Sequence, residues 1–214
     1  MYLPPHFEET DSEAIADLTA KFPLAVIVCI HDGDIIANHI PLMLNGKAQL
    51  IGHIARSNRL HELIEDGEDM LAIFRAEDAY ISPNWYPTKQ ETHRHVPTWN
   101  YQTVHVRGRV TFSHEHKDKL AVVGKLTKSQ ERQASGDRAW KMSDAPQDFM
   151  AHMLDNIVAF RIDIATITAK SKLSQNRDAV DFDSVSDAMR RLGKDSLSAE
   201  MDRIADTRKS GGSG

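Results

Sequence analysis

Four short segments carry residue types that suit ligand binding better than scaffolding. In residues 38–41, polar side chains and a proline interrupt an apolar strand. Residues 52–58 lead from a strand into a short helix. Backbone N–H groups at such a helix start, together with the paired donors of Arg56, could hold a phosphate group. The alternative is an ordinary strand-to-helix corner in which Ser57 or Asn58 caps the helix.

The third segment, residues 80–101, holds two of the three tryptophans and three of the four tyrosines. Aromatic planes flanked by amide and hydroxyl donors suit a flat heteroaromatic ring. A loop pinned to the core by its aromatic side chains is an equally good interpretation. The fourth segment, residues 172–177, is a polar cluster that follows the last expected strand. A solvated connector is the simpler interpretation of that cluster.

Other patterns indicate chemistry less specifically. His93 and His95, like the pair at residues 114 and 116, could face one side of an extended segment. Zinc sites use three or four protein ligands, and no cysteine or carboxylate pattern completes either pair, so we expect no metal site. No G-x-S-x-G elbow accompanies a Ser, His and Asp set, and the catalytic residues stay unknown. The basic residues at 190–194 are diluted by nearby acidic ones, which favours a solvated or dimer-facing helix.

The elements that position these segments follow from hydrophobic periodicity. A capping box at residues 10–13 begins a helix that ends at Pro23. We expect residues 24–31, 34–44 and 47–54 to form a three-stranded meander, with a type I′ turn at Asn45-Gly46. Further strands are expected at residues 70–74, 79–82, 104–112 and 158–167, and helices near 60–64, over 114–131, from Pro146 and from Ser184 onward.

This order of elements predicts a mainly β (α+β) fold: six or seven antiparallel strands with inserted helices and a C-terminal helix. A small closed barrel is the expected architecture, because closure removes exposed strand edges. We expect one domain over residues 1–209. Residues 210–214 read SGGSG, which is typical of a flexible linker or a cloning remnant.

The composition sets limits on partners and compartment. Of the 214 residues, 41% are hydrophobic and 27% are charged, as in ordinary water-soluble proteins, and no apolar run approaches the ~20 residues of a membrane span. The single cysteine, Cys29, and the absence of a signal-peptide pattern favour the cytoplasm. A formal net charge of -5 gives no support to direct DNA binding.

Taken together, the motifs resemble the PaiB-type family of FMN-binding negative transcriptional regulators. The resemblance extends to about Leu192, and the motifs occur in the same order and spacing. It rests on MYLPPHF at residues 1–7, HIPL at 39–42, GHIAR at 52–56, YISP at 80–83, WYPTK at 85–89, VPTWNY at 96–101 and KLSQNR at 172–177.

The resemblance implies an FMN-binding split barrel, similar to pyridoxamine-phosphate oxidases and flavin reductases, that forms a homodimer with flavin sites at the interface. By position, it implies that two strand segments border the isoalloxazine ring: His39, Ile40 and Pro41, and His53, Ile54 and Ala55. It places Arg56, Ser57 and Asn58 near the phosphate, with Lys89 as a second cation. Trp85, Tyr86, Trp99 and Asn100 would cover the ring or reach it from the partner subunit. Ser174, Gln175, Asn176 and Arg177 would line the site or brace the dimer.

Three functions remain open at this point. The resemblance implies a flavin-dependent regulator, which could act on DNA or indirectly through a small molecule or a protein. An FMN-dependent oxidoreductase of the flavin reductase or oxidase type would take electrons from a nicotinamide donor. Haem binding or degradation, as in related split barrels, is the third, for which the chain offers 11 histidines.

Overall fold

The structure, a computed structural model, describes residues 1–211. Its backbone packs into two compact units. One unit comprises Ala16–Phe74 and His105–Ile167, and we call it the barrel unit. The other comprises Met1–Ile15, Arg75–Val104 and the residues from Thr168 onward, and we call it the terminal unit. The prediction of one domain over residues 1–209 stays a prediction.

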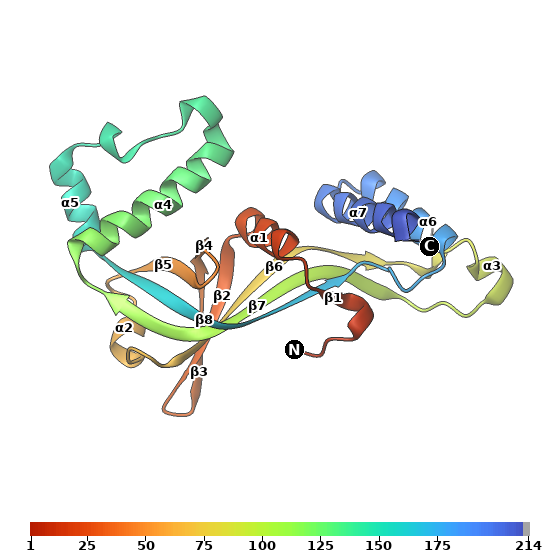
Figure 1. Cartoon of the computed structure of the whole chain (residues 1–214), viewed down its shortest axis with the longest axis horizontal. Helices are drawn as coiled ribbons and strands as arrows, with labels where there is room; N and C mark the ends of the chain where they lie inside the picture. Colours follow the sequence, from red (N-terminus) through yellow and green to blue (C-terminus); the bar gives the residue numbers. More distant parts are fainter. Residues whose placement is uncertain (212–214) are drawn as a thin grey trace. The chain divides into compact units, whose positions relative to one another are not determined.

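The strands form one sheet in the order β3-β2-β6-β7-β8-β5-β4, with the short strand β1 paired to β8 (Figure 1). Every pair whose register is defined is antiparallel. The bounds are β1 Glu8–Glu9, β2 Leu24–His31, β3 Asp34–Pro41, β4 Met43–Asn45, β5 Gln49–Ala55, β6 Asp69–Ile81, β7 Thr98–Ser113 and β8 Ile157–Lys172. This confirms the predicted fold class, a mainly antiparallel split barrel with inserted and C-terminal helices.

The type I′ turn lies in the first hairpin, between β2 and β3. His31 pairs with Asp34 across a two-residue turn in which Asp32 and Gly33 both have positive φ, at 52° and 86°. These values fit a type I′ turn. The type I′ prediction at Asn45-Gly46 is wrong: Asn45 pairs with Gln49, so the loop has three residues, and only Gly46 has positive φ.

The predicted meander of residues 24–54 is also wrong. The second expected strand divides into β3 and β4, which lie at opposite ends of the sheet order. The chain leaves β3 after Pro41, and the Leu42 N–H donates instead to the Pro23 carbonyl at 2.9 Å. The bend therefore joins the two strands at opposite ends of the sheet order.

Three strands are longer than the hydrophobic pattern predicts. The two strands expected at residues 70–74 and 79–82 are one strand, β6. Its charged middle lies on the exposed face, where Arg75 and Asp78 form an ion pair, while Ala76 and Ala79 are buried. Likewise β7 begins at Thr98 and β8 continues to Lys172, because polar residues at these strand ends, such as Asn100 and Ser171, are buried within the strands rather than in loops.

The helices and 3-10 turns occur before the first strand, between strands and at the C-terminus. Their bounds are η1 Pro5–Phe7, α1 Ser12–Lys21, α2 Leu60–Leu63, η2 Pro83–Trp85, α3 Lys89–Thr92, α4 His116–Ser135, η3 Gly136–Arg138, η4 Met142–Asp144, α5 Gln147–Asp155, α6 Ala179–Arg191 and α7 Asp195–Gly211. At the start of α1, Asp11 rather than Thr10 accepts the Glu13 N–H, at 2.9 Å. The single helix expected from Ser184 is two helices, and Gly193 with φ of 67° lies between them.

Each unit has its own core. In the barrel unit, alternate residues of the strands point inward, and Ala25, Leu42, Leu50, Phe74 and Ile162 are fully buried. In the terminal unit, α6 and α7 pack through Phe182, Val185, Met189, Leu197 and Met201 onto the buried side chains of Ala79, Ile81, Tyr86 and Leu173.

Two further observations concern the expected absence of a membrane span and the expected C-terminal tail. Within residues 1–211, no helix is both long enough and apolar enough to span a bilayer. Of the expected tail at residues 210–214, Ser210 and Gly211 belong to α7, and residues 212–214 lie outside the described residues.

Candidate functional site

The residues predicted to contact flavin fall into two sets, one in each unit. The barrel-unit set contains His39, Ile40, Pro41, His53, Ile54, Ala55, Arg56, Ser57 and Asn58. The terminal-unit set contains Trp85, Tyr86, Lys89, Trp99, Asn100, Ser174, Gln175, Asn176 and Arg177. We describe each set by itself.

Strands β3 and β5 present the barrel-unit set with alternating orientation. Ile40 and Ile54 are 5% and 3% exposed and belong to the barrel core. His39, Pro41 and Ala55 are exposed. Gly52 is needed for close packing, because an added Cβ would lie 2.6 Å from a Leu42 methyl carbon and 2.9 Å from the Phe160 ring.

His53 is the polar member of this set with a buried atom that has no hydrogen-bond partner in the described chain. It lies on β5 opposite Ala159 of β8. The buried atom is Nδ1. Burial lowers the pKa of His53, so the imidazole is neutral at physiological pH and has one donor and one acceptor nitrogen.

The segment Arg56 to Asn58 forms the corner between β5 and α2. The Asn58 side chain is used within the corner: its Oδ1 accepts the Leu60 N–H at 3.1 Å, and its Nδ2 donates to Asn38 Oδ1 at 3.0 Å. Arg56 is exposed, and one guanidinium nitrogen donates to the Asp155 carbonyl at 3.3 Å. A guanidinium has five N–H donors, so Arg56 retains donors for an anion. Helix α2 has only four residues, so the cation rather than the helix is the feature suited to phosphate.

In the terminal unit, Tyr86 connects the aromatic segment to the core. Its side chain is 2% exposed, and its hydroxyl has no hydrogen-bond partner. The His95 ring lies 4.9 Å from the Tyr86 ring, and the Arg177 guanidinium carbon also lies 4.9 Å from it. Trp85 packs partly buried against the same core. Lys89 donates to Asn84 Oδ1.

A buried carboxylate that the sequence reasoning missed holds this segment. Asp181 of α6 is 1% exposed; it accepts the Thr88 N–H at 3.1 Å and the Thr88 hydroxyl at 2.7 Å. His95 Nε2 lies 2.9 Å from the Thr88 hydroxyl and 3.8 Å from Asp181. This geometry is not a catalytic triad, because Asp181 and Thr88 share one nitrogen of His95 while Nδ1 has no partner. Thr88 and Asp181 are 93 residues apart, and no local pattern links them.

The histidine pairs do not form metal sites in the described part of the chain. His93 ends α3 with φ of 53° and is exposed, whereas His95 turns to Thr88. His114 lies against the His61 ring at 5.2 Å. No group of three His, Cys, Asp or Glu side chains within residues 1–211 is arranged to hold a metal ion.

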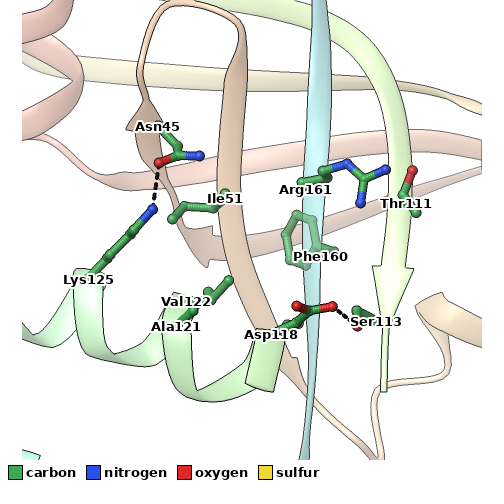
Figure 2. Close-up of a pocket in the computed structure, with 11 residues that line it drawn as sticks. Asn45, Ile51, Thr111, Ser113, Asp118, Ala121, Val122, Lys125, Phe160 and Arg161 are labelled. Atoms are coloured by element: carbon green, nitrogen blue, oxygen red, sulfur yellow. Dashed lines mark hydrogen bonds between the residues drawn. The ribbon is translucent and has the colours of Figure 1, made fainter. Parts of the chain in front are cut away.

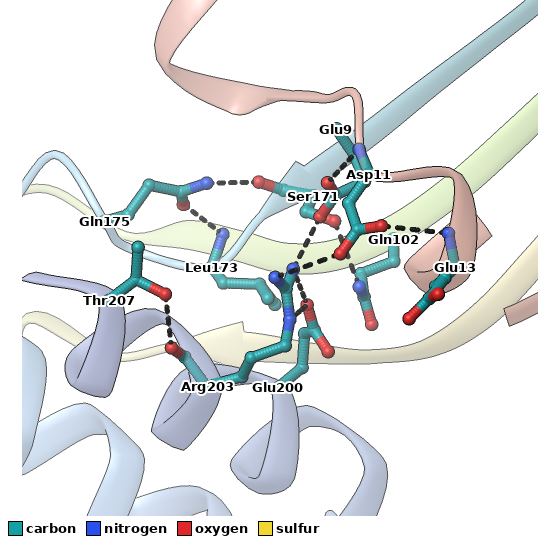
Figure 3. A network of polar contacts seen from close by, with 10 residues as sticks. All are labelled: Glu9, Asp11, Glu13, Gln102, Ser171, Leu173, Gln175, Glu200, Arg203 and Thr207. Carbon is teal, nitrogen blue, oxygen red and sulfur yellow. Dashed lines mark hydrogen bonds and ion pairs between the residues drawn. The ribbon is translucent and has the colours of Figure 1, made fainter. Parts of the chain in front are cut away.

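Asn100 and the turn after β8 form a buried polar contact. Ser174, with φ of 65°, donates its hydroxyl to Asn100 Oδ1 at 3.0 Å. Asn100 is fully buried, and its Nδ2 donor has no partner. Gln175 accepts the Leu173 N–H at 2.7 Å and donates to the Ser171 carbonyl (Figure 3). Asn176 is exposed.

A cavity of the barrel unit contains none of the predicted residues. It lies between α4 and the sheet and encloses about 180 Å³, less than the ~300 Å³ of small ligand pockets (Figure 2). Four of its polar side chains pair with one another: Ser113 donates to Asp118 at 2.6 Å, and Lys125 donates to Asn45 at 2.8 Å. The size and the pairing do not fit a flavin.

The unpartnered buried atoms are the sign that the predicted residues fit a ligand. Within residues 1–211, these atoms are His53 Nδ1, Tyr86 OH, His95 Nδ1 and Asn100 Nδ2. Three of these four residues are predicted flavin contacts. Buried polar groups are nearly always hydrogen-bonded, and leaving one unpaired costs about 1–3 kcal/mol. A flavin has ring carbonyls, ring nitrogens and ribityl hydroxyls that match such donors and acceptors.

Comparisons with known proteins agree with this chemistry. The family described as "Putative FMN-binding domain" matches residues 1–166. Protease synthase and sporulation protein PAI 2 of Bacillus subtilis is 34% identical over 187 residues, covering 85% of this chain and 86% of that protein.

Two solved structures share the fold at low sequence identity. The FAD and haem binding protein of Mycobacterium smegmatis has a TM-score of 0.57 at 17% identity, covering 83% of this chain and 79% of that one. The flavocytochrome Anf3 of Azotobacter vinelandii has a TM-score of 0.58 at 14% identity, covering 83% of this chain and 75% of that one. The family match and the 34% identity to PAI 2 carry the assignment: the chain belongs to the FMN-binding domain family that the PaiB-type motifs indicate.

Proposed function

We propose that this chain binds FMN and acts, in its flavin-bound form, as a regulatory protein. The observation that carries the proposal is that His53, Tyr86 and Asn100, three predicted flavin contacts, each bury a polar atom without a partner. The family match and the similarity to PAI 2 support the same reading.

The residues of each unit contribute different chemistry to this proposal. Bound FMN supplies a redox-active, planar heteroaromatic ring. In the barrel unit, Arg56 has guanidinium donors for the phosphate, and neutral His53 has a buried nitrogen for a polar group of the ligand. In the terminal unit, the Tyr86 hydroxyl and the Asn100 amide are buried donors.

Regulation through a small molecule or a protein partner fits the charge better than direct DNA binding. The formal net charge is -5, whereas DNA-binding surfaces concentrate lysine and arginine. A cytoplasmic site of action is part of the proposal, since the single cysteine, Cys29, is buried and free.

The outer face of the first hairpin supports a homodimer. Leu24, Ile30 and Ile35 are 59%, 63% and 75% exposed, and Ile30 pairs directly with Ile35. Val26 and Val28 lie on the same face of β2, because side chains alternate along a strand. An apolar face of this kind marks an association site, and a second copy of the chain offers the identical surface for a two-fold contact. We therefore propose this face as part of the homodimer interface.

The visible absorption spectrum tests the flavin proposal. We expect flavin bands in the purified protein, FMN in the heat-released supernatant, and saturable binding when FMN is added back. A folded protein that carries no flavin and ignores added FMN contradicts the proposal. Steady NAD(P)H oxidation by the FMN-loaded protein would assign it to the oxidoreductases, and a haem Soret band would assign it to the haem proteins.

Analytical ultracentrifugation of Ile35→Glu tests the dimer proposal. We expect the wild type to sediment as a dimer and Ile35→Glu as a monomer, because a charge would be buried at the contact. Asp34→Ala, at the exposed turn next to it, is the matched control and should stay dimeric. A wild-type monomer, or a dimeric Ile35→Glu, contradicts this interface.

A further inference from the structure

Three basic side chains gather in the terminal unit where β8 ends. They are Lys170, Lys172 and Arg177, and they follow the 166 residues that the family match covers. Lys170 and Lys172 lie two residues apart on β8, so both point to the same face of the strand, with Cα atoms about 7 Å apart.

Lys170 is buried with an aromatic surround instead of a counter-ion. It is 6% exposed, and its Nζ donates to the Tyr2 carbonyl at 3.2 Å. Its ammonium lies 5.4 Å from the Tyr101 ring centroid, 5.5 Å from that of Tyr2 and 6.0 Å from that of Phe7. Cation–π contacts stabilise such a charge without neutralising it.

Lys172 is held in place by neutral oxygen atoms. Its Nζ donates to the Thr98 hydroxyl and to the Trp99 carbonyl, the latter at 2.8 Å. Burial and the positive charges of Lys170 and Arg177 lower the pKa of Lys172. The charges of Lys170 and Arg177 therefore act unfavourably on the Lys172 ammonium.

The chain supplies no counter-charge for these cations among its described residues. No ion pair within residues 1–211 involves Lys170, Lys172 or Arg177. Arg203 of the same unit is the contrast: it pairs with Glu9 at 2.7 Å, with Glu200 at 2.5 Å and with Asp11 at 3.9 Å (Figure 3). Charges removed from solvent are normally paired, so a cluster of cations without ion pairs is suited to an anionic ligand.

An exposed aromatic pair lies next to the cluster. Trp99 is 51% exposed and Tyr80 is 47% exposed, and their ring centroids are 5.9 Å apart at 75°. Lys172 donates to the Trp99 carbonyl, which ties the cation to the backbone of the residue that carries one of these rings. A planar heteroaromatic group could contact the rings while an attached anion contacts the cations.

We propose that Lys170, Lys172 and Arg177 form a binding site for a phosphate monoester, with Tyr80 and Trp99 as the surface for the planar ring attached to it. A phosphate monoester carries about -1.5 to -2 charges at neutral pH and so compensates most of the cluster. The phosphate belongs either to FMN itself, which would replace the phosphate contact proposed for Arg56, or to a second phosphorylated ligand. The first alternative rests on the proposed function, and the second does not.

Isothermal titration calorimetry of the full chain at low ionic strength separates these sources. The probes are inorganic phosphate, FMN and riboflavin, and the variants are Lys172→Gln, Arg177→Gln and the charge-restoring Lys172→Arg. Lys172→Gln keeps an N–H donor for Thr98 and Trp99, and Arg177→Gln tests the site from outside the strand. Arg191→Gln removes an exposed cation of α6 and is the control.

We expect the wild type and Arg191→Gln to bind phosphate equally, Lys172→Gln and Arg177→Gln to bind it at least about tenfold more weakly, and Lys172→Arg to recover most of the affinity. If Lys172→Gln weakens FMN but not riboflavin, the phosphate of FMN is the ligand. If Lys172→Gln weakens the binding of inorganic phosphate but not that of FMN, the site binds a second phosphorylated ligand. The site is overturned if Lys172→Gln and Arg177→Gln bind both phosphate and FMN as tightly as the wild type does. Phosphate binding without any FMN binding contradicts the proposed function and leaves the site standing.

Discussion

The two units bury different kinds of side chain. Every buried polar or charged residue of the described chain except Thr19 and Lys119 lies in the terminal unit, including Asn100, Lys170 and Asp181. The barrel unit is filled by apolar side chains such as Leu50, Phe74 and Ile162. The stability of the barrel unit therefore depends mainly on how well its side chains fit together. The stability of the terminal unit depends also on hydrogen-bond partners for its buried polar groups.

The difference between the two units indicates where ligand-binding groups are to be expected. Buried polar groups destabilise a fold unless they are paired, so their concentration in one unit calls for a reason beyond packing. Some, such as Gln102 with Ser171 at 3.0 Å, are paired inside the chain. Others, the Tyr86 hydroxyl and Asn100 Nδ2, are not. We attribute the unpaired ones to ligand binding.

The strongest test of the polar character of the terminal unit is Asp181→Ala. Its removal leaves the Thr88 N–H and hydroxyl without their buried acceptor. We expect urea unfolding to show a loss of about 3 kcal/mol in the free energy of unfolding. Asp183→Ala, at an exposed site of the same helix, should change it by less than about 0.5 kcal/mol. Equal effects of the two substitutions would show that burial of the carboxylate does not matter.

The shape limit of the barrel unit is tested by Gly108→Ala. An added Cβ would lie 2.2 Å from the Asp163 carbonyl oxygen, so the β7 and β8 backbones would have to move apart. We expect a loss of about 2 kcal/mol in the free energy of unfolding. The control is Gly124→Ala in α4, where the nearest atom, Met142 Sδ, lies 3.7 Å away. That helical substitution should stabilise by about 0.5–1 kcal/mol, and the opposite order of the two variants contradicts the packing argument.

Tyr86→Phe and Ser174→Ala compare an unpaired hydroxyl with a paired one. Without ligand, Tyr86→Phe should leave the free energy of unfolding unchanged or raise it by up to about 1 kcal/mol, because it removes a polar group that has no partner. Ser174→Ala should lower it by about 1 kcal/mol, because Asn100 loses its donor. FMN affinity should fall about tenfold in Tyr86→Phe, as measured by flavin fluorescence. An unchanged affinity would remove Tyr86 from the flavin contacts.

The last prediction concerns the response of stability to pH, through two histidines of the barrel unit. Burial lowers the pKa values of His53 and His105, so the folded chain binds protons less readily than the unfolded chain, in which histidine has its usual pKa of 6.5. Stability is then full above pH 6.5 and falls as the pH is lowered, by at most about 1.4 kcal/mol per histidine and pH unit. Urea unfolding at pH 7.5 and 5.5 should show a smaller fall in His53→Gln. A fall as steep as that of the wild type would contradict a buried, neutral His53.

Sequence periodicity predicted the strand content well but not the path of the chain. The apolar run of residues 24–31 and the Asp32-Gly33 turn match β2 and its hairpin. Pro41 indicated an interruption of the second expected strand, but the change of hydrogen-bond partner at Leu42 could not be predicted, because it depends on the position of Pro23 in the fold. The long strands were shortened in the prediction because charged residues such as Arg75 interrupt the hydrophobic pattern without interrupting the strand.

For the candidate site, motifs identified segments but not partners. The WYPTK and KLSQNR motifs contain Tyr86 and Arg177, which lie 4.9 Å apart. Asp181 was missed because it acts on a residue 93 positions away, and Lys170 because the last strand was predicted to end at residue 167. Contacts between distant segments depend on the fold, which a single sequence does not display.

The most direct test of the central claim is the stability of the chain with and without FMN. A ligand that binds only the folded state raises the free energy of unfolding by about 2.7 kcal/mol at a concentration 100 times its Kd. We predict this increase in urea unfolding of the wild-type chain with saturating FMN. An unfolding curve that FMN does not shift at any concentration would contradict flavin binding by this protein.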